Sequence, residues 1–365
     1  MSLPSFDKEF FPVQRFYASR GASLRWTTDR ELPVPADFGD SVREYDLLME
    51  QAAWVDFSHM GMVSLSGPEH VAFLGGLTTN QVCHVAASRS LYSALLTPQG
   101  RYLWDFTLVA HGADQEPPGL LLITEPDRVP ALLQQLAFYR LRAKVQITDE
   151  RSRFGLLGLI GPAVDQALGA LFPGLALAGA APGATFAPEP GMRLWRDPRQ
   201  EKFGWRLLLP VDRWSSMEEQ LVAALAPAGW TAWEACRIRH ALPRGGNEWI
   251  PDETLPLEAG LLEMNGVDFG KGCYVGQETT TRTHHRGTIK RRLFRLTGPA
   301  GVAWAAGTTV QRPDGKVAGM ITSSCSQTGA SLALLQLADV AHAQGTLFVQ
   351  AHPMVVDKPA WAGWA

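Results

Sequence analysis

Short strands and helices alternate along the first two thirds of the chain. Residues 62–67 alternate apolar and polar side chains and end at Gly67-Pro68, which predicts a half-buried strand followed by a helix. The same signals predict helices over 41–53 (capped by Ser41), 129–141, 164–171, 214–226 (capped by a serine) and 233–242, a hairpin of strands 91–96 and 102–110, and strands over 120–124, 154–160 and 206–210. Residues 173–191 are rich in Ala, Gly and Pro, so we expect a loop there.

Two segments of this pattern resemble each other. Leu65-Ser66-Gly67-Pro68 and Leu159-Ile160-Gly161-Pro162 each join a predicted strand to a predicted helix through Gly-Pro. A match of this kind favours an internal duplication of an α+β unit.

After residue 288 the predicted strands become shorter and lie closer together. They cover 292–296, 308–311, 316–323, 332–336 and 346–349, and turns rich in Gly and Pro separate them. Such a run is typical of an appended small barrel or sandwich. We therefore predict an α+β protein with domains over 1–145, 146–288 and 289–365.

Composition and charge set limits on the class of protein. The chain is 46% hydrophobic and 19% charged, which is ordinary for a globular protein. Its net charge of -3 gives no overall basic footprint, so bulk binding to nucleic acid or to an anionic membrane is not expected. No run approaches the roughly 18 apolar residues of a membrane helix, and the first residues do not read as a signal or transit peptide.

The cysteines are widely spaced. Cys83, Cys236, Cys273 and Cys325 form no CxxC pair. Zinc and iron–sulfur sites usually show paired ligands, so we predict no permanently bound metal or cluster held by this chain alone. The spacing is not that of a disulfide framework either, and a reducing cytoplasm is the expected compartment.

The octapeptide from Lys271 to Glu278 (KGCYVGQE) is the most informative segment of the chain. It places Cys273 on a glycine-rich stretch two residues after Lys271. Glycine lets the backbone take positive φ or approach a ligand closely, and a nearby cation favours the reactive thiolate. The segment therefore predicts a reactive thiol on an exposed turn. A turn that holds a buried, inert cysteine is the alternative.

Two further segments carry groups that suit a flat, polar ligand. Asp105 follows the predicted hairpin turn, where a carboxylate can accept a hydrogen bond from a heterocycle or can simply cap the turn. Trp233, Arg237 and His240 share one face of a predicted helix. A tryptophan can stack on a ring and an arginine can bind a carboxylate. An amphipathic helix with a buried tryptophan explains the same spacing.

A basic run follows the octapeptide. It contains Arg282, His284, His285, Arg286, Lys290, Arg291, Arg292 and Arg295. In a chain of negative net charge this run is a local cationic patch that suits a polyanion, such as a polyglutamate tail or an RNA backbone. A solvated hinge before the last domain is the alternative. The His284-His285 pair has no third ligand nearby in sequence, so we predict no metal site there.

Motifs of several other enzyme classes do not occur. The chain has no Walker-type loop, no GxGxxG after a strand, no HExxH and no GxSxG. A thiol hydrolase pairing Cys273 with His284 or His285 would also need an orienting acid and an oxyanion loop, and neither is evident.

The octapeptide, with Arg282 four residues beyond it, resembles the hallmark of the YgfZ-type folate-binding proteins, relatives of the T-protein (aminomethyltransferase) of glycine cleavage. The resemblance extends from about residue 45 to about residue 350, and it includes Leu65 to Pro68 and Thr78 to Val82. It implies a ring of α+β units closed by a small C-terminal β-barrel, with a folate in a central cavity. It also implies a tetrahydrofolate-binding accessory protein that supports iron–sulfur cluster assembly or repair and thereby tRNA-modifying enzymes.

The resemblance also assigns site residues. It implies chemistry at Cys273, with Lys271 and Asp105 beside it. The residues that it implies for folate binding are Trp233, Arg237, Asp105, Tyr274, Gln277, Glu278 and Arg282, with Arg237 on the folate glutamate. The partners implied are iron–sulfur enzymes or assembly proteins, and tRNA-modifying enzymes.

Departures from the T-protein pattern argue against glycine cleavage. Trp104 stands where the T-protein has the first of two aspartates, and its folate-gripping glutamate is matched only loosely by Glu201 or Lys202. The second tryptophan that the folate-binding family is thought to use falls near Met60 by spacing. We therefore expect an accessory protein rather than a stand-alone enzyme. The alternatives are a folate-dependent aminomethyltransferase or demethylase and a tRNA-binding module.

Overall fold

The computed structural model describes residues 17, 20–26, 33–112, 119–258, 260–287, 289–343 and 345–364. The chain divides into two compact units, and each unit combines segments that are distant in sequence. The first unit is drawn from Met1–His70, His84–Ser90 and Thr107–Trp233. The second unit is drawn from Val71–Cys83, Leu91–Phe106 and Glu234–Ala365. The domain boundaries expected at 145 and 288 stay a prediction.

A six-stranded sheet forms the core of the first unit. Its strands, in spatial order, are β10 (Thr185–Phe186), β11 (Arg193–Arg196), β12 (Trp205–Pro210), β9 (Phe154–Ile160), β3 (Ala53–Asp56) and β13 (Ala226–Pro227). Helices α5 (Val164–Leu171) and α6 (Trp214–Ala224) bury Leu168 and Leu221 in one cluster with Leu157 and Leu207 of this sheet. Burial of this apolar surface is the main stabilising contribution to such a layer.

A second sheet has the order β5-β6-β7-β4-β8. Its strands are β5 (Leu91–Leu96), β6 (Tyr102–His111), β7 (Gly119–Thr124), β4 (Gly61–Ser66) and β8 (Gln146–Asp149). The predicted hairpin of β5 and β6 is present, and Gly100 takes φ +79 at its turn. The first half of β6 belongs to the second unit, and its second half pairs with β7 in the first.

The Gly-Pro repeat occupies two equivalent places in the first unit. Gly67 follows β4 with φ +102, and Gly161 follows β9 with φ +127. A side chain at either glycine would meet a backbone carbonyl, that of Lys144 at 2.5 Å for Gly67 and that of Gln51 for Gly161. Both strand-to-helix corners therefore require glycine for the same two reasons.

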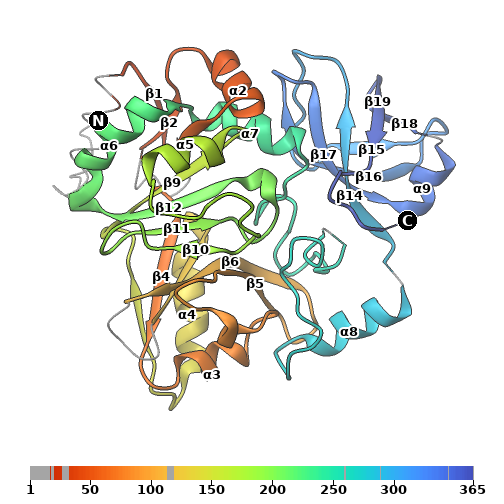
Figure 1. The fold of residues 1–365 in the computed structure, drawn as a ribbon. Coiled ribbons are helices and arrows are strands. Elements are labelled where there is room, and N and C mark those ends of the chain that lie inside the picture. The colour runs from red at the N-terminus through yellow and green to blue at the C-terminus, as the bar shows by residue number, and fades with distance from the viewer. Residues whose placement is uncertain are drawn as a thin grey trace, which may run out of the picture. The chain divides into compact units, whose positions relative to one another are not determined.

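The C-terminal part of the second unit is a closed barrel, drawn in blue in Figure 1. Its strands, in order around the barrel, are β14 (Arg291–Thr297), β17 (Ala330–Gln336), β16 (Val317–Cys325), β15 (Thr309–Gln311), β18 (Thr346–Val349) and β19 (His352–Asp357). Five of the six were predicted. Closure depends on β19, because it pairs with both β14 and β18. The interior is filled by residues such as Leu296, Ile321 and Leu347.

Most predicted helices are present, but two of their caps were wrong. The remaining elements are β1 (Ser23–Trp26), β2 (Pro33–Asp37), α2 (Ser41–Glu50), α3 (His70–Gly75), α4 (Val129–Arg140), α7 (Trp230–Arg239), α8 (Gln277–Arg286), α9 (Leu337–His342), and the 3₁₀ helices η2 (Val82–His84), η3 (Pro126–Arg128), η4 (Glu201–Phe203) and η5 (Val211–Arg213). The cap of α2 is Asp40 rather than Ser41, since its carboxylate accepts from the N–H groups of Val42 and Arg43. Helix α6 begins after Arg213 with no side-chain cap.

Candidate functional site

The octapeptide forms an extended loop that leads into α8 within the second unit. The segment just before it is fixed to residues 76–80. Thr79 Oγ1 donates to Gly266 O at 2.6 Å, and Asn80 Nδ2 donates to Asn265 O at 2.8 Å. Within the loop, Val275 N donates to Gly76 O at 3.3 Å. These bonds satisfy polar groups on both segments, so the loop rests on a fixed support.

Lys271 is the buried anchor of the loop. It is 7% exposed, and its ammonium donates to the carbonyl oxygens of Gly75, at 2.7 Å, and Thr78. It also lies 4.8 Å from the ring centre of Tyr274. Burial lowers the pKa of Lys271 to about 8, against the opposing attraction of Asp268 and Cys83. Lys271 thus ties the loop to its support.

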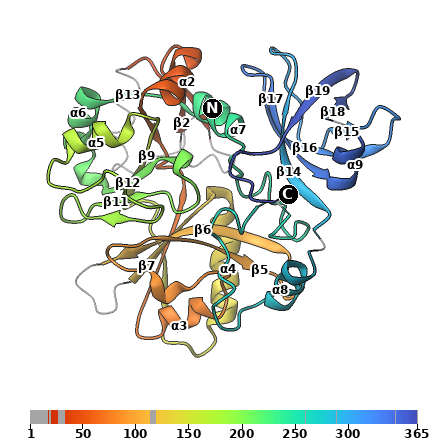
Figure 2. The same cartoon turned by 45° about the vertical axis from the view of Figure 1, so that its right-hand side comes forward.

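Cys273 is exposed to solvent, and the glycines near it differ in what they require. Gly276 takes φ +82, and a side chain there would lie 2.5 Å from Thr97 O and 3.0 Å from the Cα of Gly100. Apart from its two chain neighbours, no atom of the described residues lies within 4 Å of the place that a side chain at Gly272 would occupy. The fold therefore requires Gly276, whereas the open space at Gly272 lies beside the thiol. Figure 2 shows α8 next to β5.

The rest of the motif shapes the start of α8. The phenol of Tyr274 is buried, and burial raises its pKa to about 12. Gln277 N donates to Tyr274 O at 3.2 Å, and Thr280 Oγ1 donates to Gly276 O at 3.3 Å. Glu278 is exposed in the first turn of the helix, where a carboxylate suits the helix dipole.

The basic run divides into an ion-paired part and an exposed part. Arg291 and Arg292 form ion pairs with Glu258 and Glu263, which join the barrel to the segment before α8. Arg295 pairs with Asp357 within the barrel, between β14 and β19. The exposed residues are Arg282, His284, His285, Arg286 and Lys290, which we call the α8 basic surface. His284 stacks on Phe269 with ring centres 4.1 Å apart. The cationic patch is therefore smaller than the sequence indicated, and it begins at Arg282, nine residues after Cys273.

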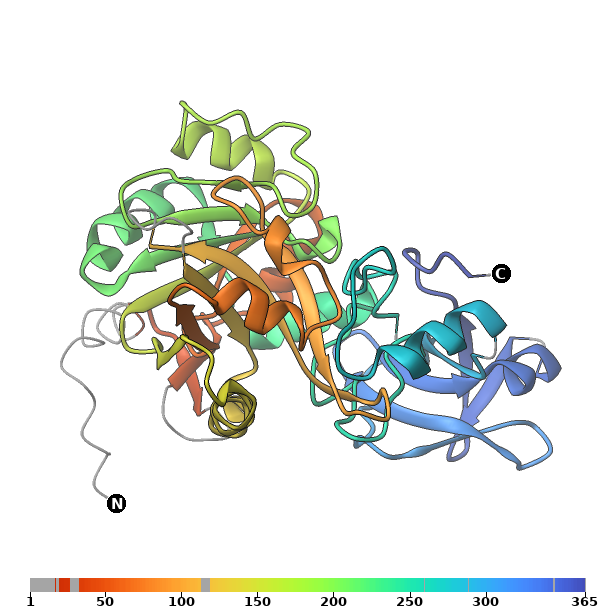
Figure 3. The ribbon, with the colours of Figure 1, turned by 90° about the horizontal axis from the view of Figure 1, so that it is seen from below.

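Asp105 is held by tyrosine hydroxyls. It is 8% exposed, Tyr92 Oη donates to its Oδ2 at 2.6 Å, and Tyr102 Oη donates to its Oδ1. The indole of Trp249 packs on both phenol rings, with ring centres about 6 Å apart. Gly245 lies against the carboxylate so closely that a methyl group there would overlap it. In Figure 3 the orange hairpin of β5 and β6, which carries Asp105, extends toward the teal segment before α8.

Trp233 and Arg237 lie on one helix, α7, but in different surroundings. Trp233 is 3% exposed in the first unit, where it meets the ring of Phe57 edge-on at 5.5 Å, and the Arg206 guanidinium lies 5.8 Å from its ring centre. Arg237 is 1% exposed in the second unit. Its donors reach both carboxylate oxygens of Glu234 as well as Leu242 O, Glu248 and Ser323.

The residues expected to form one site lie in different parts of the structure. One group is consecutive in the second unit and contains Lys271, Cys273 and Tyr274 on the loop and Gln277 at the start of α8. Trp233 is instead buried in the first unit. A folate carboxylate would have to displace a protein acceptor to reach Arg237, so that contact stays a prediction. Among the residues that the structure describes, no group of three His, Cys, Asp or Glu side chains is placed to hold a metal ion. No helix in the same residues is long and apolar enough to cross a membrane.

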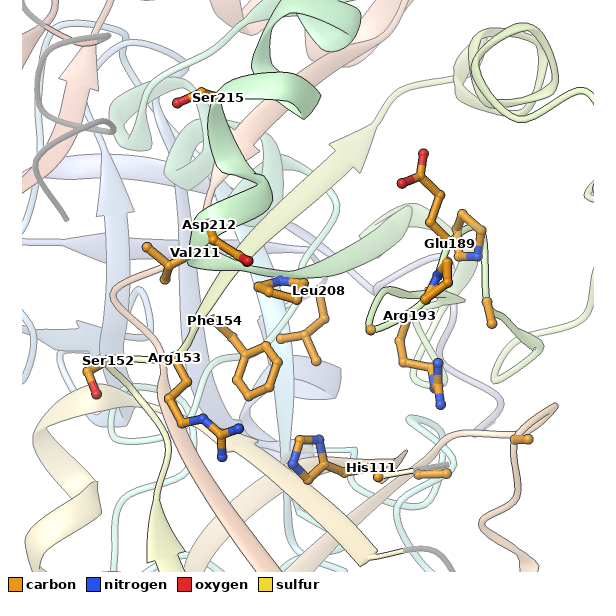
Figure 4. Close-up of a pocket in the computed structure, with 18 residues that line it drawn as sticks. His111, Ser152, Arg153, Phe154, Glu189, Arg193, Leu208, Val211, Asp212 and Ser215 are labelled. Carbon is orange, nitrogen blue, oxygen red and sulfur yellow. The ribbon is translucent and has the colours of Figure 1, made fainter. Parts of the chain in front are cut away.

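The sequence did not reveal a large cleft in the first unit. Its volume is about 1210 Å³, and it is lined by the ends of several strands and by the segment 187–191. His111, Arg153 and Arg193 are among its polar residues, as Figure 4 shows. They are 42 and 40 residues apart in sequence, so no local motif could have identified them.

Comparison with known proteins identifies the family. Residues 16–268 match the model of the GCVT N-terminal domain, and residues 290–364 match that of the CAF17 C-terminal β-barrel domain. Iron–sulfur cluster assembly factor IBA57, mitochondrial, from Homo sapiens is 33% identical over 300 residues, which cover 77% of this chain and 78% of the human protein. The chain belongs to the IBA57 family. The Mus musculus member is 32% identical over 300 residues and covers 77% of each chain.

A solved structure shows the same fold. Aminomethyltransferase T of the glycine cleavage system from Bartonella henselae superposes with a TM-score of 0.80 at 19% identity, and 96% of this chain and 97% of that chain are covered. The α+β class, the T-protein-like fold and the C-terminal barrel are thus confirmed. The expected relationship to the T-protein is confirmed at the level of the IBA57 family, and the narrower YgfZ-type assignment stays a prediction.

The expected compartment was wrong. The IBA57 relatives from human, mouse and Aspergillus oryzae are all mitochondrial proteins, whereas the cysteine pattern predicts the cytoplasm. Unpaired, widely spaced cysteines indicate only a compartment that keeps thiols reduced. They do not distinguish one reducing compartment from another.

Proposed function

We propose that this chain is a tetrahydrofolate-binding accessory protein that supports iron–sulfur cluster assembly or repair, with Cys273 as its working thiol. The observation that carries the proposal is the exposed Cys273 on a fixed loop, in a member of the IBA57 family. The cluster is cargo here rather than a resident cofactor. The thiolate of Cys273 makes a transient contact with a cluster, a sulfur species or a thiol of a partner.

The geometry around Cys273 supports a contact that needs a partner. Iron–sulfur clusters usually take four protein ligands, and the loop offers one thiol at its surface. The open space beside Gly272 allows a second protein to approach the sulfur closely. Rigid support from Lys271 means that the thiol is presented without a rearrangement of the loop. The remaining ligands in this proposal come from the partner.

The α8 basic surface favours partners with an acidic face. Its exposed basic residues begin at Arg282 on α8, the helix that the octapeptide leads into, so a negatively charged surface bound there would be oriented relative to the thiol. Complementary charge of this kind raises association rates and fixes the orientation of docking. We propose iron–sulfur enzymes or assembly proteins as the partners, and tRNA-modifying enzymes as clients among them.

Asp105 fits a role in holding a folate. Two tyrosine hydroxyls donate to its carboxylate and fix the orientation of that group. A carboxylate oriented in this way can accept a hydrogen bond from a ring N–H of tetrahydrofolate. Bound tetrahydrofolate would supply a carrier for one-carbon units, while Asp105 would orient it. The GcvT-like fold supports this part of the proposal.

Complementation of a strain that lacks the gene tests the role of the thiol. We expect Cys273→Ser to lose at least 90% of the rescued iron–sulfur enzyme activity while its melting temperature stays unchanged, since the side chain is exposed. Cys83→Ser is the matched control, because Cys83 is also exposed and lies in the same unit. Full rescue by Cys273→Ser would refute the proposed role of the thiol.

Thermal unfolding with added tetrahydrofolate tests the cofactor. A ligand present at a hundred times its Kd stabilises the native state by about 2.7 kcal/mol, which raises the Tm measurably. Asp105→Asn keeps the size of the side chain and removes its charge, so we expect a smaller shift. The absence of any shift near millimolar tetrahydrofolate in the wild-type protein would overturn the folate proposal.

A folate-dependent one-carbon transferase is the alternative that the structure favours next. The oriented carboxylate of Asp105 in a T-protein-like fold is the observation behind it. The buried Trp104 beside it occupies the position where the T-protein has a second carboxylate. Formation of methylenetetrahydrofolate from a methylamine donor by the purified protein would establish this alternative.

A further inference from the structure

The end of helix α4, in the first unit, carries the two most exposed large apolar side chains of the described residues. Phe138 is 72% exposed in the last turn of the helix, and Leu141, which follows the helix directly, is 87% exposed. Other apolar residues on the surface are more covered, such as Val42 on α2 at 56%. Apolar groups that lie together at a surface, unlike single scattered ones, mark interaction sites.

The backbone of Leu141 is strained. It takes φ 42 and ψ -105, a conformation that a residue with a Cβ atom rarely adopts. Glycine would take it without strain, and packing cannot offset the strain because the leucine side chain is exposed. Strain of this kind concentrates at sites that bind ligands or partners. Neither local conformation nor packing within the chain thus explains a leucine at this position.

The turn that carries Leu141 is held in place by hydrogen bonds. Ala143 N donates to Arg140 O at 2.7 Å, and Val145 N donates to Ala143 O at 2.9 Å. The backbone N–H of Lys144 donates to the carboxylate of Glu69, at the corner between β4 and α3. The apolar side chains are therefore presented by a fixed turn, and little conformational freedom is lost when they meet a partner.

Positive charge surrounds the two apolar side chains. Arg140, Arg142 and Lys144 are all exposed, and the nearest acidic residues along the chain are Asp127 and Asp149. A cation in the last turn of a helix suits the helix dipole, which accounts for Arg140. Arg142 and Lys144 lie beyond the helix, so the dipole does not account for them. We call residues 138–144, with their exposed apolar and basic side chains, the α4 tip.

We infer that the α4 tip docks on the surface of an anionic lipid bilayer. Phe138 and Leu141 enter the headgroup region, and the three cations of the tip bind lipid phosphates around them. Binding of this kind increases with the apolar area that enters the bilayer and with the attraction between cations and anionic lipids. The inference depends neither on the proposed folate site nor on the proposed role of Cys273.

A bilayer suits the α4 tip better than a protein partner does. Stable protein interfaces bury about 800 Å² on each partner around a packed apolar centre, and the tip offers only Phe138 and Leu141 for such a centre. A bilayer surface needs no complementary shape. The net charge of -3 does not oppose docking, because charges are screened over about 8 Å at physiological ionic strength and the tip is locally basic.

Cosedimentation of the whole chain with lipid vesicles tests the inference. Each Lys or Arg near an anionic surface contributes about fivefold in affinity. We therefore expect binding to mixed phosphatidylglycerol and phosphatidylcholine vesicles to be at least about tenfold tighter than to phosphatidylcholine alone, and to weaken as salt is raised. Arg142→Gln should lower binding to the mixed vesicles about fivefold. Phe138→Ser combined with Leu141→Gly should lower it about tenfold or more.

Leu141→Gly alone separates docking from folding. Glycine relieves the strained backbone, so this variant should unfold at a urea midpoint equal to or above that of the wild-type protein while it binds vesicles less tightly. Val42→Ser and Arg43→Gln are the matched controls, because both residues are exposed on α2 in the same unit. Figure 1 shows α2 at the top of that unit and α4 near its bottom. The controls should bind vesicles as the wild-type protein does.

Three results would overturn the inference. The first is that the wild-type protein fails to bind the mixed vesicles at low salt. The second is that the double variant at Phe138 and Leu141 binds them as tightly as the wild-type protein. The third is an equal loss of binding in Val42→Ser or Arg43→Gln. If vesicles are not bound and the tip variants lose rescue of iron–sulfur enzymes at wild-type stability, the α4 tip contacts a protein and the bilayer assignment is wrong.

Discussion

Substitution of Gly276 by alanine is the sharpest test of how the thiol loop is held. The new methyl group would lie 2.5 Å from Thr97 O and 3.0 Å from the Cα of Gly100, and the residue would keep a φ of +82. A left-handed conformation costs an ordinary residue about 1–2 kcal/mol, and overpacking against backbone costs about 1–3 kcal/mol. The loss of chain freedom in the unfolded state returns about 0.4–1 kcal/mol. We therefore expect Gly276→Ala to destabilise the protein by about 3 kcal/mol.

The assay is urea unfolding followed by the fluorescence of the buried tryptophans. The change in free energy comes from the shift of the midpoint, provided that the slope m stays the same. Gly272→Ala is the matched control, because it adds the same methyl group four residues away in open space. That variant should unfold within about 0.5 kcal/mol of the wild-type protein.

The same pair of variants separates stability from function. If a partner approaches the sulfur across Gly272, Gly272→Ala should lose rescue of iron–sulfur enzymes at wild-type stability. A Gly276→Ala protein as stable as the wild type would refute the account of the loop given above. Full rescue by Gly272→Ala would refute the close approach of a partner on that side of Cys273.

Two further predictions concern buried charges. Burial lowers the pKa of Lys271 to about 8 from an ordinary value of 10.5, so between these values the unfolded chain binds more protons and stability rises with pH. Lys271→Met cannot titrate, so its free energy of unfolding should rise less between pH 8 and pH 10 than that of the wild-type protein. An equal rise in both proteins would contradict the burial of this ammonium group. Arg237→Met leaves the fully buried Glu248 without its cation, and the loss should be about 3–5 kcal/mol in urea unfolding without folate. Unchanged stability combined with weaker folate binding would instead assign Arg237 to the ligand.

Local signals predicted the elements well, because they depend on residues a few positions apart. The Gly-Pro corners at Gly67 and Gly161 needed only a strand, a break and a helix in order. Caps were less certain, since Asp40 and Ser41 are both good capping residues and the path of the entering chain selects between them. Helix α8 was not predicted from the sequence, because its residues are polar and form no apolar face.

The surroundings of the site residues could not be predicted in the same way. The cation of Lys271 was expected to act on Cys273 two residues away, but its hydrogen bonds go to carbonyls near residue 76. Glu234 lies three residues before Arg237, so that ion pair is visible in the sequence, whereas Glu248 and Ser323 come from distant segments. Contacts of this kind depend on how the chain folds back on itself, which no periodicity records.

The anchorage of Lys271 has a consequence for biosynthesis. Its ammonium binds Gly75 and Thr78, which precede it by 196 and 193 residues. Those carbonyls leave the ribosome long before the lysine does, so the loop reaches its final conformation only late in translation. Closing so long a segment is slow compared with forming a helix or hairpin. A nascent or truncated chain that ends before Lys271 therefore lacks this anchor, and the loop can be ordered only once Lys271 has been added.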